Sequence, residues 1–71
     1  MATSLRITLG TQVRKVRLSR GLTQEVLAER LGVTPRYFAG IERGERNLTL
    51  DSVDALAEQL GVEAQSLLLV S

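Results

Sequence analysis

The chain has 71 residues with a net charge of +1, and it contains neither Cys nor His. This inventory excludes disulfides, thiolate or imidazole metal ligands and histidine-based acid–base catalysis. The sequence also lacks a glycine-rich phosphate loop and is too short to hold a separate ligand domain, so we expect no enzyme, no cofactor, no metal and no small-molecule ligand. No apolar run approaches the roughly 20 residues of a membrane span and no signal peptide opens the chain, so a cytoplasmic protein without membrane contact is expected.

The first helix is predicted to begin at Ser4 or at Leu9 and to end at Arg20. Its apolar face consists of residues at helical spacing: Leu5, Leu9, Val13 and Val16. Gly10 interrupts this face, so residues 1–8 either belong to the helix or form a separately packed arm.

Two short helices joined by a tight turn follow, over about residues 24–31 and 35–43. Thr23 and Thr34 stand where N-cap residues accept backbone hydrogen bonds, and Gly32 can adopt the left-handed conformation that ends the first of the two helices. The side chains that a crossed helix pair would bury are Leu27, Leu31, Val33, Phe38 and Ile41. This layout predicts a helical corner that presents its second helix to DNA.

The C-terminal part of the chain predicts two further helices, over about residues 50–60 and 63–69. Thr49 can cap the first of these helices, and Gly61 can end it. Their apolar residues are Leu50, Val53, Leu56, Ala57 and Leu60, followed by Leu67, Leu68, Leu69 and Val70. No segment alternates with a period of two, so the sequence predicts an all-α protein without a sheet. A chain this short forms one domain, residues 1–71, whose small core would gain stability from a dimer interface.

Charge is distributed unevenly along the chain. Residues 1–36 carry seven Lys and Arg and two Glu, a net charge of +5, whereas residues 37–71 carry two Arg and six Asp and Glu, a net charge of −4. A basic face separated from an acidic, apolar end is the distribution expected of a nucleic-acid module. The alternative is ordinary variation of a protein surface.

The residues of the helical corner resemble those of the Xre/Cro family, the phage-repressor-like helix-turn-helix regulators. The places at which that family carries a glutamine, a small residue, a turn glycine and apolar anchors hold Gln24, Ala28, Gly32, Val33 and Ile41. The resemblance covers about residues 9–68 and implies a five-helix, lambda-repressor-like DNA-binding domain with its helix-turn-helix motif at about 24–43. Among the branches of the family, the chain looks most like the controller proteins of restriction-modification systems, in which Tyr37, the GIER of 40–43 and the RNLT of 46–49 recur.

The second helix of the motif would lie in the major groove. Advancing about 100° per residue places Phe38 and Ile41 on one side of this helix and Arg36, Gly40 and Arg43 on the other. The first side is apolar and faces the core. The second side faces outward, and we expect Gly40 to leave room there for the floor of the groove.

Arg36 is the first candidate for base readout, because its planar guanidinium can bond O6 and N7 of guanine together. Tyr37 and Thr34 are further candidates. The alternatives are a solvated surface arginine, a half-buried tyrosine and a threonine that only caps the helix. Many relatives carry polar side chains where this chain has Pro35 and Ala39, so we expect no base contact from these two positions.

The resemblance also implies contacts to the phosphate backbone, from Gln24, Arg17, Arg43, Arg46, Asn47 and Ser52. The dipole of the helix that begins at Gln24 supports that role. Glu42 matches a residue that pairs with an arginine corresponding to Arg17, and such a pair would orient Arg17 toward phosphate, although its structural role alone explains it. For Arg46 and Asn47 the alternative is solvation of a loop.

The acidic C-terminal end is rich in leucine, and relatives dimerise through the helices that correspond to about residues 50–69. Candidate interface residues are Leu50, Val53, Leu67 and Leu69, each of which could instead belong to the core of one protomer. The resemblance thus implies a transcriptional regulator that binds a pseudo-palindromic operator in double-stranded DNA as a homodimer, with RNA polymerase as a further candidate partner. The alternative is an antitoxin or protein-interaction module built on the same fold. A divalent-ion site at Asp51, Asp54 and Glu58 is disfavoured relative to a solvated acidic face.

Overall fold

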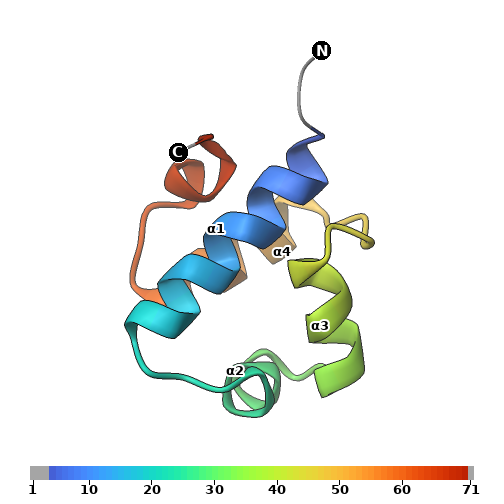
Figure 1. Ribbon diagram of the computed structural model, residues 1–71, viewed down its shortest axis with the longest axis vertical. Coiled ribbons are helices and arrows are strands. Elements are labelled where there is room, and N and C mark those ends of the chain that lie inside the picture. The colour runs from blue at the N-terminus through green and yellow to red at the C-terminus, as the bar shows by residue number, and fades with distance from the viewer. Residues whose placement is uncertain (1–3, 71) are drawn as a thin grey trace.

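The computed structural model describes residues 4–70, which contain α-helices and a short 3-10 helix but no strand (Figure 1). The elements are α1 (Leu5–Ser19), α2 (Gln24–Leu31), α3 (Pro35–Glu42), α4 (Leu50–Leu60) and the 3-10 helix η1 (Ala64–Leu68). The prediction of an all-helical protein is confirmed, whereas the prediction of a fifth α-helix is wrong. η1 is only five residues long, and the backbone N–H of Ser66 donates to the carbonyl of Glu63, a bond over three residues that suits such short segments.

α1 begins at the earlier of its two predicted positions. The hydroxyl of Ser4 accepts a hydrogen bond from the backbone N–H of Arg6, at 3.3 Å. Residues 5–8 therefore continue the helix, and the arm alternative is wrong for them; residues 1–3 lie outside the described part of the chain. Leu9 and Val13 are buried as expected, but Leu5 is 62% exposed.

Gly10 marks the point at which α1 crosses the end of α3. A Cβ atom on Gly10 would lie 2.5 Å from the carbonyl oxygens of both Ile41 and Glu42. Gly10 interrupts the apolar face, but α1 continues through it, and the missing side chain allows the two helices to approach each other closely.

The predicted corner of α2 and α3 is confirmed together with its caps. Thr23 Oγ1 accepts a hydrogen bond from the N–H of Val26 at 3.1 Å, and Gly32 ends α2 with φ of 73°. The N–H of Val33 returns to the carbonyl of Ala28 at 3.0 Å, which closes the turn. The direction of α3 is thus fixed by local hydrogen bonds.

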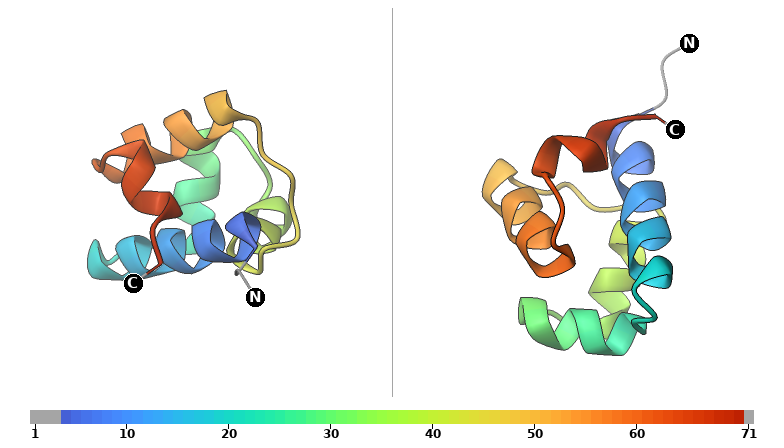
Figure 2. Two further views of the ribbon diagram at one scale, coloured as in Figure 1. Left: turned by 90° about the horizontal axis from the view of Figure 1, so that it is seen from above. Right: turned by 90° about the vertical axis from the view of Figure 1, so that its left-hand side faces the viewer.

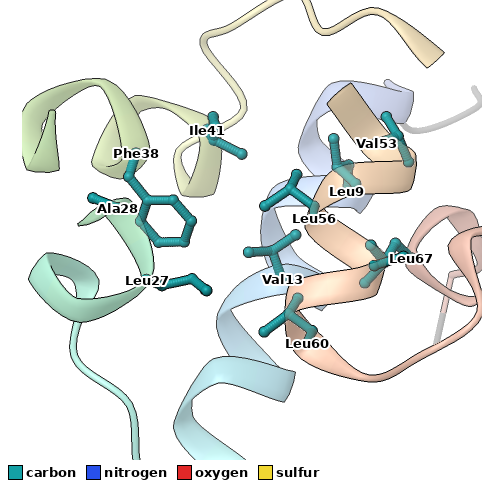
Figure 3. Packing of buried hydrophobic residues seen from close by; sticks show 11 residues of the cluster. Leu9, Val13, Leu27, Ala28, Phe38, Ile41, Val53, Leu56, Leu60 and Leu67 are labelled. Atoms are coloured by element: carbon teal, nitrogen blue, oxygen red, sulfur yellow. The ribbon is translucent and has the colours of Figure 1, made fainter. Parts of the chain in front are cut away.

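The core joins this corner to the rest of the molecule. Figure 3 shows Leu27 and Phe38 pointing toward side chains of α1 and α4. Large side chains that are fully or almost fully buried are Phe38, Leu27, Leu56, Leu60, Leu67 and Val13. α2 and η1 lie at opposite ends of the molecule (Figures 1 and 2), so the C-terminal segment is well separated from the corner.

Candidate nucleic-acid interface

The two sides of α3 differ in burial. Phe38 and Ile41 are 0% and 4% exposed, whereas Arg36 lies exposed to solvent. The predicted division of this helix into a core side and an outward side is confirmed for these residues. Tyr37 lies between the two sides and is half-buried.

The start of α3 holds Arg36 in a defined place. Thr34 Oγ1 accepts a hydrogen bond from the N–H of Tyr37 at 3.0 Å, and Pro35 occupies the first helical position. Arg36 follows directly, in the first turn. Because the N-terminal residues of such a helix are those that reach base edges, a side chain here is well placed to contact DNA. Thr34 is a cap in the structure, and its contact with a base stays a prediction.

The loop after α3 covers Gly40, which we expected to lie open to DNA. A Cβ atom on Gly40 would lie 3.0 Å from Nε and 3.3 Å from Cγ of Arg46. The guanidinium carbon of Arg46 is 4.9 Å from the centre of the Tyr37 ring, a distance typical of a cation–π contact. The expectation of a bare helix surface at Gly40 is therefore wrong, because an arginine from the loop occupies that space.

Glu42, the last residue of α3, joins three helices. Its carboxylate accepts hydrogen bonds from Nε and Nη2 of Arg17 at 2.6 and 3.1 Å, and from Nε2 of Gln24 at 2.8 Å. Arg17 also donates from Nη1 to the carbonyl of Leu22 at 2.9 Å. The side chains of Arg17 and Glu42 are only 9% and 4% exposed. The hydrogen bond to Glu42 raises the pKa of Arg17 above its ordinary value, although burial acts in the opposite direction.

This network determines what Arg17 and Gln24 can offer to a phosphate. The expected pairing of Arg17 with Glu42 is present, and it leaves Arg17 buried with donors engaged on all three guanidinium nitrogens. The bond from Gln24 to the same carboxylate was not expected, and it turns the amide nitrogen of Gln24 inward. The first backbone N–H groups of α2 lie outside the hydrogen-bond ladder of that helix, so they can donate to an anion.

The other phosphate candidates lie exposed around the loop between α3 and α4 and the start of α4. They are Arg43, Arg46, Asn47 and Ser52. Nη2 of Arg43 pairs with Oε1 of Glu45 at 3.1 Å, and both side chains are more than half exposed. The hydrogen bond from Arg43 lowers the pKa of Glu45 below its ordinary value. Thr49 caps α4 by accepting a hydrogen bond from the N–H of Ser52 at 3.1 Å.

Comparison with known proteins assigns this arrangement to a family. Residues 13–67 match the helix-turn-helix family, so the match extends from α1 into η1 and includes the whole corner. The chain belongs to the Xre/Cro-type helix-turn-helix family. The family that the residues of the corner predicted is confirmed.

Within the helix-turn-helix family, the chain is similar to controller proteins. It is 38% identical over 69 residues to control protein C.BamHI of Bacillus amyloliquefaciens, covering 96% of this chain and 85% of that protein. The restriction-modification controller protein C.AhdI from Aeromonas hydrophila has a TM-score of 0.80 and 37% identity, over 87% of this chain and 94% of its own. The controller protein C.Esp1396I, solved as a tetramer in complex with its natural 35 base-pair operator, has a TM-score of 0.79 and 33% identity, over 93% and 87%. The family and these relatives identify the chain as a regulator and not an enzyme.

The four candidate residues for a dimer interface of this helix-turn-helix protein fall into two groups by their exposure. Leu50 and Leu69 are 80% and 61% exposed, so their side chains are available to a partner. Val53 and Leu67 are 7% and 0% exposed and belong to the core of the protomer. For Val53 and Leu67 the structure thus favours the core alternative, because both side chains belong to the buried hydrophobic cluster that also contains Leu9 and Val13 of α1 (Figure 3).

Among residues 4–70, no group of three or more acidic side chains is arranged to hold a metal ion, and this includes Asp51, Asp54 and Glu58. None of the helices formed by these residues has the length and apolar character needed to cross a bilayer.

Proposed function

We propose that this protein is a sequence-specific transcriptional regulator that binds duplex DNA as a homodimer, and that it is the controller protein of a restriction-modification system. The observation that carries the proposal is the exposure of Arg36 in the first turn of α3. The Thr34 cap fixes the start of this helix, while Phe38 anchors its opposite side in the core. An arginine held in this way can bond O6 and N7 of one guanine. Tyr37 and Thr34 complete the proposed base readout.

The relatives support both parts of this proposal. C.Esp1396I has been solved on its operator, which supports DNA binding by an assembly of such chains. C.BamHI and C.AhdI are 38% and 37% identical to this chain, and the matches cover 85% and 94% of their own lengths, which supports the controller subtype.

Two groups of residues complete the proposed contact with the DNA backbone. The exposed group consists of Arg43, Arg46, Asn47 and Ser52 and contacts phosphates directly. The second group is the network of Arg17, Glu42 and Gln24. In this network Arg17 holds Glu42, and Glu42 holds Gln24 at the start of α2, where backbone amides and the helix dipole favour a phosphate.

The homodimer would place two copies of α3 in successive major grooves. In a two-fold assembly the two helices lie about 34 to 36 Å apart, one turn of DNA. Leu50 and Leu69 supply exposed apolar surface for the contact. Operator occupancy then rises with the concentration of the protein itself, because dimer formation and DNA binding are linked.

The experiment that tests this function is selection of bound duplexes from a random pool, followed by sequencing. We expect enrichment of a two-fold symmetric site whose half-sites are centred about one helical turn apart. Affinity for that site should fall steeply as salt rises, since phosphate contacts release counterions. Recovery of unenriched sequences, or of sites without symmetry, would contradict the proposal.

One observation favours the alternative of a protein-interaction module. An apolar groove of about 440 Å³ lies between the α2–α3 turn, the side of α3 and α4, with Leu31, Val33, Leu48 and Leu56 in its lining. A peptide segment of a partner would fit such a surface. The neighbouring genes distinguish the two functions: a restriction enzyme and a methyltransferase support the controller, whereas a toxin gene supports the antitoxin.

A further inference from the structure

We propose that Gly40 is a positioning residue that acts through Arg46. Gly40 has no side chain, and together with the Tyr37 ring it forms a seat for Arg46. This seat holds Arg46 along the outward side of α3, in place for contact with DNA. This proposal rests on the proposed function, because the cation is positioned for a DNA-binding role.

The geometry of the seat comes from two independent contacts. A Cβ on Gly40 would lie 3.0 Å from Nε, 3.3 Å from Cγ and 3.7 Å from Cδ of Arg46, so the stem of the arginine follows the helix surface where residue 40 has no side chain. The guanidinium carbon then lies 4.9 Å from the centre of the Tyr37 ring. Gly40 is buried although it occupies the outward side of the helix, and Arg46 is the residue found above it.

The seat places the guanidinium of Arg46 beside residue 40, a position at which α3 itself carries no side chain. A flexible arginine loses rotamer freedom when DNA orders it, and this loss weakens binding. An arginine that is already ordered by a ring and a helix surface loses less. We therefore expect the seat to strengthen DNA binding without contributing a DNA contact of its own.

Arg43 provides an internal comparison. It comes from the same end of α3, but its contact is an ion pair with Glu45 in which both side chains are more than half exposed. Exposed pairs of this kind are screened by salt and order their side chains weakly. Only Arg46 should therefore depend on the absence of a side chain at Gly40.

The test is a double-mutant cycle for binding to the duplex selected by the wild-type protein. Gly40→Ala should weaken binding by about two- to fivefold, the range that corresponds to an exposed cation–π contact. In an Arg46→Ala background the same Gly40→Ala change should alter affinity by less than about 1.5-fold, whereas in an Arg43→Ala background it should keep its full effect. Thermal unfolding of each variant controls for loss of fold.

Several outcomes would overturn the proposal. If Gly40→Ala weakens binding equally in the wild-type protein and in the Arg46→Ala variant, Gly40 provides clearance for the DNA itself and does not act through Arg46. If it has no effect, the seat contributes nothing to binding, and if it strengthens binding, the seat holds Arg46 away from DNA. Failure of the wild-type protein to bind any duplex would instead contradict the proposed function.

A measurement without DNA tests the seat by itself. In the free protein, the ring current of Tyr37 should shift the δ-methylene protons of Arg46 upfield in the NMR spectrum. Gly40→Ala and Tyr37→Leu should both return these resonances toward their ordinary position, while Tyr37→Phe, which keeps a ring, should retain the shift. Unshifted Arg46 resonances in the wild-type protein would overturn the seat whatever the DNA measurements give.

Discussion

The carboxylate of Glu42 accepts two hydrogen bonds from the guanidinium of Arg17, at 2.6 and 3.1 Å, and thereby ties the end of α3 to α1. The same carboxylate accepts a hydrogen bond from Gln24 at the start of α2. One buried charge pair therefore sets the relative positions of three helices, two of which form the corner that would meet DNA.

Removal of Glu42 should be strongly destabilising. Glu42→Ala leaves the guanidinium of Arg17 buried without its counter-charge, and we expect a loss of about 3 kcal/mol in the free energy of unfolding, measured with urea. A domain of this size has a total stability of only roughly 4 to 10 kcal/mol. The double variant Arg17→Met/Glu42→Leu, which removes both charges, should recover more than half of that loss. A cost below about 0.5 kcal/mol for Glu42→Ala would show that the pair does not hold the corner.

The exposed ion pair of Arg43 and Glu45 should make the stability of the fold depend on pH. Arg43 lowers the pKa of Glu45 in the folded protein, so the stabilising effect of this pair is present above the ordinary pKa of 4.5 and is lost as pH falls through the lower folded value. NMR titration of the Glu45 carboxyl carbon should give a midpoint below 4.5, and Arg43→Ala or high salt should move it upward. Equal midpoints with and without Arg43 would contradict the pairing. Arg17 adds no pH dependence near neutrality, because its raised pKa keeps it charged there.

Gly10→Ala should destabilise the protein although alanine is the better helix former. The new methyl group would lie 2.5 Å from two backbone carbonyl oxygens at the end of α3, so α1 and α3 would have to move apart. We expect a cost of about 2 to 3 kcal/mol in urea unfolding, as for other overpacked sites. Thr11→Ala, at the exposed neighbouring position of α1, is the control and should change stability by less than about 0.5 kcal/mol. Similar stabilities for the two variants would refute the close crossing.

Charges placed on the proposed dimer surface should separate the subunits. Leu50→Glu and Leu69→Glu change side chains that are 80% and 61% exposed, so the fold should tolerate both. In sedimentation equilibrium we expect dimer dissociation constants at least about tenfold weaker than that of the wild-type protein. Leu18→Glu, which is 56% exposed on α1 and is not a candidate, should leave dimerisation unchanged. Unaltered association of both variants would place the interface elsewhere.

The sequence predicted those features that depend on neighbouring residues. The caps at Thr23 and Thr34 and the left-handed Gly32 could be recognised because each acts within one turn of its own position. The core side of α3 was predictable for the same reason, since helical periodicity places Phe38 and Ile41 together.

The sequence could not predict features that depend on distant segments. The close helix crossing at Gly10 could not be predicted and Gly40 was misinterpreted, because the groups that cover them come from other elements. These groups are the carbonyls at the end of α3 and the side chain of Arg46. Periodicity likewise marks Leu50 and Val53 as equally apolar, and only the position of η1 and α1 decides which of them is buried. η1 itself is too short for periodicity to distinguish a 3-10 helix from an α-helix.

The most direct test of base readout by Arg36 compares the wild-type protein with the Arg36→Ala variant. The affinity of each protein is measured for the selected duplex and for duplexes in which each guanine in turn is replaced. The wild-type protein should discriminate against loss of one guanine by about five- to 150-fold, the range of a bidentate arginine contact. The Arg36→Ala variant should bind the selected duplex and the duplex that lacks this guanine nearly equally. The Arg30→Ala variant, which removes an exposed arginine at the end of α2, should keep the preference for guanine. An Arg36→Ala protein with an unchanged guanine preference would contradict the assignment of Arg36 as the reader.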